Sequence, residues 1–285
     1  MRSSYRRGST RGSDRRRKKR RRLHVKAVFF IMIAAAILSG AVYLREKAKS
    51  ANPQLGDDLC RVTQSPASYH AVLIDRTDPY NETQRASIKK MLETWRAQIP
   101  TWSQVTVFAV SGVNETRLTP ELSLCNPPAE ADRLIQNPER VKERWNAGFV
   151  LPLERRIDEL IGAEALPHSP IMEMIQSVAI SAFPEVSSSG VAREPRELVI
   201  ISDMLHNTEE YSHYRDTTLS FRAFRDTPYF QRIRADLRGV VITIFYARRD
   251  GDGAELRQGR DHVTFWEEYF MSMGATLNRV RRVSG

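Results

Sequence analysis

The chain has 285 residues and a formal net charge of +10, with 44 Lys and Arg residues against 34 Asp and Glu. Thirteen of those basic residues lie in residues 1–26 beside a single acid, Asp14, so the remaining chain holds 31 basic and 33 acidic residues. The high charge is a property of the N-terminal tail. The rest of the chain is nearly neutral and gives no basis for a nucleic-acid-binding domain.

Residues 27–44, which follow the basic tail (residues 1–26), form an apolar run of eighteen residues without a charge. As an α-helix this run is about 27 Å long, close to the thickness of the hydrocarbon core of a membrane. The excess of Lys and Arg before it predicts a single-pass protein of the inner (plasma) membrane, with a cytoplasmic N-terminus and a periplasmic or otherwise extracytoplasmic C-terminal domain. A cleaved signal peptide is the alternative interpretation of the same run.

Residues 45–66 are polar with no apolar period and are predicted to link the membrane helix to one domain, residues 67–285. The two cysteines, Cys60 and Cys125, both lie beyond the apolar run. An even number of cysteines in an oxidising compartment predicts one disulfide. It would close a loop of about 64 residues. Two unrelated buried thiols are the alternative.

Short apolar runs alternate with segments of helical periodicity through the predicted domain. Strands are predicted at residues 71–74, 105–110, 121–125, 198–202, 240–246 and 276–283. Helices are predicted at residues 81–99, 137–162, 169–179 and 261–273, with Pro152 interrupting the second. Near-continuous Val, Ile and Leu runs separated by helices indicate an α/β fold, a doubly wound, mainly parallel sheet with helices on both faces.

Two acids end strongly apolar strands: Asp75 follows Ala-Val-Leu-Ile, and Asp203 follows Leu-Val-Ile-Ile-Ser. In open α/β sheets, ligands bind outside the carboxyl ends of the strands, where the strand order reverses. Thr77 lies on the turn after Asp75, and Ser169 is predicted to be the N-cap of a helix. Two carboxylates and two hydroxyls are oxygen donors of the kind that a hard divalent cation prefers. Helix capping by the two acids is the simpler structural interpretation.

These residues resemble the metal-ion-dependent adhesion site of von Willebrand factor type A domains. That family has D-x-S-x-S after its first strand, a Thr before Pro-Leu at a later helix start, and an Asp after an apolar strand. The corresponding segments here are Asp75-Arg76-Thr77-Asp78-Pro79, Ser169-Pro170-Ile171 and Ile200-Ile201-Ser202-Asp203. The resemblance implies a Mg²⁺ or Mn²⁺ site formed by Asp75, Thr77, Ser169 and Asp203.

The resemblance is incomplete because Pro79 stands where the family has the last Ser of its first motif. Proline has no side-chain ligand, and Asp78 is the alternative oxygen donor. The interpretations left open are a degenerate site that still holds the metal and a metal-free version of the fold.

The expected function is that of a binding or scaffolding module that engages another membrane or envelope protein, and not that of an enzyme. An alternative is a metal-assisted hydrolase that uses the same acids, with His206 or His213 in the loop beside the cleft as its base. A purely structural subunit of an envelope assembly is the third alternative.

Overall fold

A computed structural model gives the fold of the chain. It describes the backbone of residues 11–23 and all atoms of residues 24–109, 118–132, 134–161, 168–184, 194–215, 219–249 and 257–285. The contacts divide the chain into two compact units, Met1–Pro53 and Gln54–Gly285.

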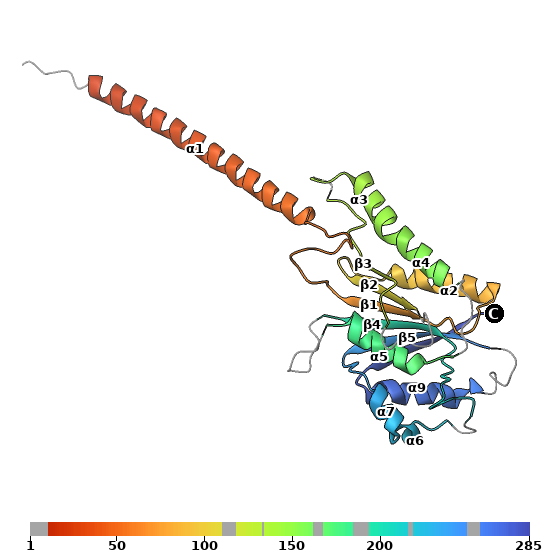
Figure 1. The fold of residues 1–285 in the computed structure, drawn as a ribbon. Helices are drawn as coiled ribbons and strands as arrows, with labels where there is room; N and C mark the ends of the chain where they lie inside the picture. The colour runs from red at the N-terminus through yellow and green to blue at the C-terminus, as the bar shows by residue number, and fades with distance from the viewer. Residues whose placement is uncertain are drawn as a thin grey trace, which may run out of the picture. The chain divides into compact units, whose positions relative to one another are not determined.

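The first unit contains α1, a 41-residue helix, Arg11–Ala51 (Figure 1). Within the described residues, His24–Ala51 is the one stretch long and apolar enough to cross a membrane, a test that a signal sequence near the N-terminus also passes. The helix includes the predicted apolar run, residues 27–44, and continues to Ala51, inside the range predicted as a linker. Residues 1–10 of the basic tail lie outside the described residues.

The second unit is built on a six-stranded sheet with the order β3-β2-β1-β4-β5-β6. Its strands are β1 (Tyr69–Ile74), β2 (Gln104–Ala109), β3 (Leu122–Cys125), β4 (Arg196–Ser202), β5 (Val240–Ala247) and β6 (Thr276–Val283). Neighbouring strands are parallel except for β3, which runs antiparallel to β2 at one edge. This sheet confirms the predicted α/β fold class.

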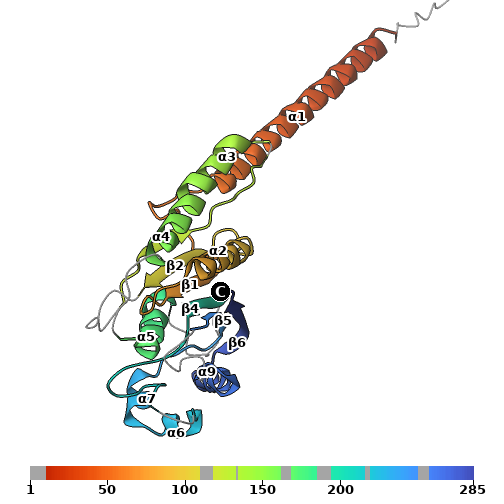
Figure 2. The same ribbon diagram turned by 90° about the vertical axis from the view of Figure 1, so that its right-hand side faces the viewer.

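Helices cover both faces of the sheet, as Figures 1 and 2 show. One face carries α2 (Glu82–Arg96) and the consecutive segments α3 (Pro138–Trp145), η1 (Asn146–Val150) and α4 (Leu151–Ile161). The other face carries α5 (Ile171–Ala182), α6 (Phe221–Arg225), α7 (Pro228–Ile233) and α9 (Arg260–Ser272). Each face has its own buried apolar cluster: Val72 and Ile74 of β1 belong to one, and Ala71 and Leu73 to the other. This alternation follows from the two-residue period of a strand.

The predicted interruption at Pro152 occurs as a π-helical turn, Asn146–Val150, which ends two residues before the proline. Pro152 has no backbone N–H, so the α-helical ladder loses one hydrogen bond there. The wider turn is marked by the N–H of Leu151, which donates to the carbonyl of Asn146. The predicted end of this helix at Gly162 lies outside the described residues.

The predicted disulfide is confirmed: Cys60 and Cys125 are bonded, with an S–S distance of 2.01 Å. Cys125 ends β3, and Cys60 lies in the segment that enters the domain. One hydrogen bond crosses the same junction, from the N–H of Cys125 to the carbonyl of Asp58 (2.8 Å). Another, from the N–H of Gly56 to the carbonyl of Cys60 (2.9 Å), closes a turn within the entering segment. The disulfide therefore fastens the start of the domain to an edge strand.

Replacing both Cys60 and Cys125 with serine is expected to lower the free energy of unfolding by about 4 kcal/mol, since the closed loop restricts the unfolded chain. Urea denaturation of residues 54–285 measures this change, because that unit contains both apolar clusters and all six strands and can fold as a separate domain. The reduced wild-type domain is the control and should match the variant. Equal urea midpoints for oxidised wild type and variant would contradict the prediction.

Candidate functional site

The two strand-end acids meet because β1 and β4 are parallel neighbours in the middle of the sheet. Their last paired residues are Ile74 and Ile201, so Asp75 and Ser202-Asp203 follow side by side. From β1 the chain moves outward to β2 on one side and later to β4 on the other. The acids therefore lie at the position where the strand order reverses, as expected of a ligand site in this fold class.

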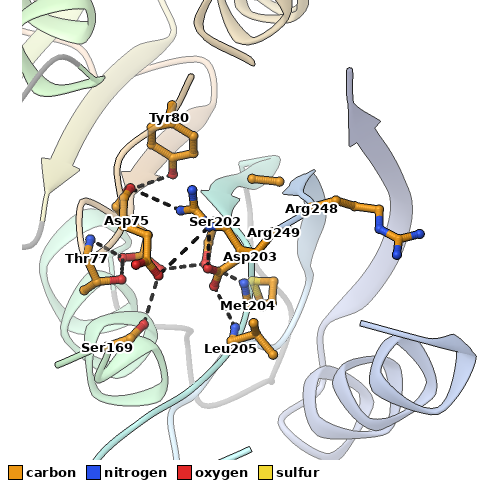
Figure 3. Close-up of polar contacts among 12 residues, drawn as sticks. Asp75, Thr77, Tyr80, Ser169, Ser202, Asp203, Met204, Leu205, Arg248 and Arg249 are labelled. Carbon is orange, nitrogen blue, oxygen red and sulfur yellow. Dashed lines mark hydrogen bonds and ion pairs between the residues drawn. The ribbon is translucent and has the colours of Figure 1, made fainter. Parts of the chain in front are cut away.

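Asp75 is buried, with 2% of its surface exposed, and its carboxylate accepts four hydrogen bonds. Oδ1 accepts from the backbone N–H (3.0 Å) and the hydroxyl (2.7 Å) of Thr77. Oδ2 accepts from the hydroxyls of Ser202 (2.7 Å) and Ser169 (3.3 Å) (Figure 3). Three of the predicted site residues are thus in direct contact, and Ser202 joins them.

The prediction that Ser169 is a helix N-cap is wrong by one residue, because the N-cap of α5 is Pro170. The Ser169 hydroxyl bonds to Asp75 instead, which leaves it unavailable to the helix. Its backbone pairs with Asn207 in an isolated bridge, so the start of α5 is fastened to the loop after β4. Capping is also not the role of Asp75, since Asn81 caps the following helix, α2.

Asp203 is 1% exposed, and its negative charge is compensated by Arg249. The sequence alone did not predict this arginine as a site residue. Its Oδ2 accepts a hydrogen bond from Nε of Arg249 (2.8 Å), and its Oδ1 accepts one from the backbone N–H of Leu205 (2.9 Å). The two Nη atoms of Arg249 donate to the carbonyls of Pro79 (2.7 Å) and Asp78 (3.1 Å). Arg249 therefore joins the end of β5 to the loop after β1.

Tyr80 is a second residue that the sequence analysis missed. Its buried hydroxyl donates to the carbonyls of Asp75 (2.7 Å) and Ile201 (3.1 Å), at the last pairing of the central strands. The guanidinium of Arg249 lies over its ring, 5.1 Å from the centroid. Tyr80 therefore supports the site in two ways: its hydroxyl bonds to two backbone carbonyls, and its ring packs against the guanidinium of Arg249.

Burial and the nearby negative charge of Asp75 raise the pKa of Asp203 to about 7, against the opposing effect of Arg249. The backbone after Asp203 is held in place from two sides. Met204 has a left-handed φ of 61°, and its N–H donates to the Ser202 hydroxyl (2.7 Å). Gln258 donates to the carbonyl of Asp203 (3.0 Å). The C-terminal ends of β1 and β4, here called the carboxyl edge of the sheet, are therefore held firmly in place around the two acids.

A divalent ion, which the resemblance implies, does not fit this arrangement. Asp75 already accepts four hydrogen bonds, and Asp203 already pairs with a guanidinium. The carboxylate of Asp78, the alternative donor, lies 4.0 Å from Nε of Arg249. Within the described residues, no group of three or more His, Cys, Asp or Glu side chains is placed to hold a metal. A dication would have to lie beside a fixed positive charge that is already paired with Asp203, one of its four predicted ligands.

The two histidines proposed as a base in the hydrolase alternative, His206 and His213, are both 0% exposed. Nδ1 of His213 is 3.1 Å from Nε2 of His262, a third buried histidine, on α9. His262 in turn contacts the hydroxyl of Tyr246 (2.7 Å). The three rings lie among aromatic side chains on the face covered by α5 and α9, away from solvent. The three histidines are therefore part of the buried core on this face of the sheet.

Burial lowers the pKa of all three histidines, to about 3 for His206, to about 4 for His262, and well below the usual value for His213. The folded state therefore keeps them neutral, whereas the unfolded chain protonates them near pH 6.5. Their contribution to stability is fully present above pH 6.5 and is lost as the pH falls. Asp203 acts in the opposite direction, because its raised pKa favours the folded state below pH 7.

The domain is expected to lose stability on acidification from pH 7.5 to 5.5. Each buried histidine whose folded pKa lies below 5.5 removes about 1.4 kcal/mol over this interval, and the raised pKa of Asp203 offsets part of that loss. Urea denaturation at the two pH values measures it. The Asp203→Asn variant, which lacks the opposing carboxyl, should show a steeper loss. A stability that is unchanged or higher at pH 5.5 would contradict the buried, neutral state of the histidines.

The fold and this cluster together define an α/β domain with a buried acidic site at the carboxyl edge of its sheet, preceded by one long apolar helix. No protein-family model matches the chain, and no curated protein matches it.

Among solved structures, the chain is similar to an aerotolerance-related membrane protein from Bacteroides fragilis NCTC 9343 that carries multiple mutations to serines. The two share 11% identity with a TM-score of 0.35, and the match covers 76% of this chain and 92% of the other. It is also similar to the conserved hypothetical protein BatB from Bacteroides thetaiotaomicron, with 10% identity, a TM-score of 0.37, and coverage of 76% and 91%. A third is proximal thread matrix protein 1 from the mussel byssus, with 10% identity, a TM-score of 0.34, and coverage of 74% and 48%. The function of this chain is therefore inferred from its own residues.

Proposed function

We propose that the chain is a single-pass membrane protein whose extracytoplasmic α/β domain binds another membrane or envelope protein at the carboxyl edge of its sheet. The observation that carries this proposal is the Asp75 cluster. Residues from β1, β4 and the start of α5 converge there on one carboxylate, at the position where proteins of this fold class bind ligands.

The topology rests on α1 and the disulfide. The apolar part of α1 follows the basic residues of the tail, an asymmetry that keeps the N-terminus in the cytoplasm. The Cys60–Cys125 disulfide lies in the domain after the helix, and disulfides persist in oxidising compartments. Both features favour a domain outside the cytoplasm, and the length of the apolar run, residues 27–44, favours an anchor that stays uncleaved.

Binding is favoured over hydrolysis by the state of the polar groups. The acids are held by hydrogen bonds and an arginine, and the candidate bases His206 and His213 are enclosed in the core. A general base has to reach the proton that it removes, directly or through one water. The resemblance to von Willebrand factor type A domains supports the same choice, because Asp75, Thr77, Ser169 and Asp203 gather at one edge as that family's binding site implies.

The topology predicts that protease added outside intact spheroplasts digests the domain of the full-length chain while the basic tail stays protected. Immunoblots with one tag at each terminus follow the two parts separately. Disrupted spheroplasts, in which both tags are lost, are the control. Survival of the domain in intact spheroplasts would contradict an extracytoplasmic location.

The binding proposal predicts that the full-length chain co-purifies with a specific protein from detergent-solubilised membranes. Asp78→Lys is expected to reduce that recovery at least about tenfold, because it reverses a half-exposed charge on the loop beside the cluster and an unfavourable charge pair at an interface costs several kcal/mol. Glu139→Lys, the same reversal on an exposed residue of α3, is the matched control and should leave recovery unchanged. Equal recovery with both variants would exclude the carboxyl edge as the binding surface.

A further inference from the structure

Arg249 is the feature of the carboxyl edge that the family resemblance does not account for. It lies two residues beyond the end of β5, and its side chain turns toward the acids, whereas that of its neighbour Arg248 points away (Figure 3). Its side chain is 14% exposed, unusually low for an arginine. A charge buried to this degree needs partners that compensate for lost hydration.

The partners of Arg249 are oxygen atoms from two different loops. Nε bonds to the carboxylate of Asp203, and the two Nη atoms bond to the carbonyls of Pro79 and Asp78. All three nitrogens of the guanidinium are therefore used at once. A planar fork of this kind is preorganised to hold several oxygens, and it stays charged at every physiological pH.

The position of Arg249 is fixed by its own backbone. Its N–H donates to Oε1 of Gln258 (2.8 Å), and the amide of Gln258 donates to the carbonyls of Ala247 (2.8 Å) and Asp203 (3.0 Å). Gln258 thus links the end of β5 to Asp203, the acid whose charge Arg249 neutralises. The guanidinium is held against Asp203 by this connection as well as by charge attraction.

We infer that Arg249 is the resident cation of this site: its guanidinium takes the place of a divalent ion among the strand-end oxygens of Asp78, Pro79 and Asp203. While Arg249 is present, the site is closed to Mg²⁺ and Mn²⁺. Without it, the carboxylate of Asp203 and the carbonyls of Asp78 and Pro79 lose the positive charge that they share. Removal of the guanidinium should therefore convert the edge into a site for a hard divalent cation.

The first test is thermal denaturation of residues 54–285, with Mn²⁺ or with chelator, for wild type and two variants. Wild type should melt at the same temperature in both buffers. Arg249→Met should melt roughly 10 °C lower in chelator, because it leaves a buried carboxylate without its partner. It should recover part of that loss in Mn²⁺. Arg248→Met, the matched control, should behave as wild type. A Mn²⁺-dependent rise in wild type, or no Mn²⁺ response in Arg249→Met, would overturn the inference.

A double-mutant cycle keeps the inference testable if Arg249→Met does not fold. Asp203→Asn combined with Arg249→Met removes both charges, so the double variant should fold even where Arg249→Met does not. Where Arg249→Met does fold, the double variant should melt well above the level expected from adding the two single losses. It should also show no response to Mn²⁺, since the acid is absent. Losses that simply add, or a double variant that also fails to fold, would show that Arg249 does not act as the counter-charge of Asp203.

Discussion

The parallel pairing of β1 with β4 sets the main constraint on this domain, because it carries two carboxylates into the interior side by side. Asp75 and Asp203 follow the last paired residues of the two central strands and are both buried. Burying two like charges is costly unless each is hydrogen-bonded or paired with an opposite charge. The polar residues of the carboxyl edge meet this requirement: three hydroxyls and a backbone N–H on Asp75, and a backbone N–H and a guanidinium on Asp203.

Most of the fold could be predicted from the sequence because the central strands are covered on both faces. Such strands are nearly continuous apolar runs, and the runs at residues 198–202 and 240–246 locate β4 and β5 to within two residues at each end. The disulfide followed from the number and placement of the cysteines. The long helix interrupted at Pro152 followed from the chemistry of proline, although the π-helical turn that accommodates it did not.

The candidate site could be predicted only where a residue follows its own strand. Asp75 and Asp203 are recognisable as strand-end acids, and the structure brings them together with Thr77 and Ser169. Arg249 was missed because its partners, Pro79 and Asp203, are 170 and 46 residues away along the chain, and such distances leave no local pattern. One available signal was its position just beyond the β5 run, at the same edge of the sheet as the acids.

The covalent attachment of Arg249 has a consequence for how the site comes into being. A protein that depends on a bound ion has an empty state, whose population follows the ion's concentration. A side chain that serves as the cation has no such state, since it is present in the chain at a fixed ratio of one to one. The edge is completed in the same event in which β5 joins the sheet and brings Arg249 to Asp203. For this domain, folding and the completion of this edge are therefore the same event.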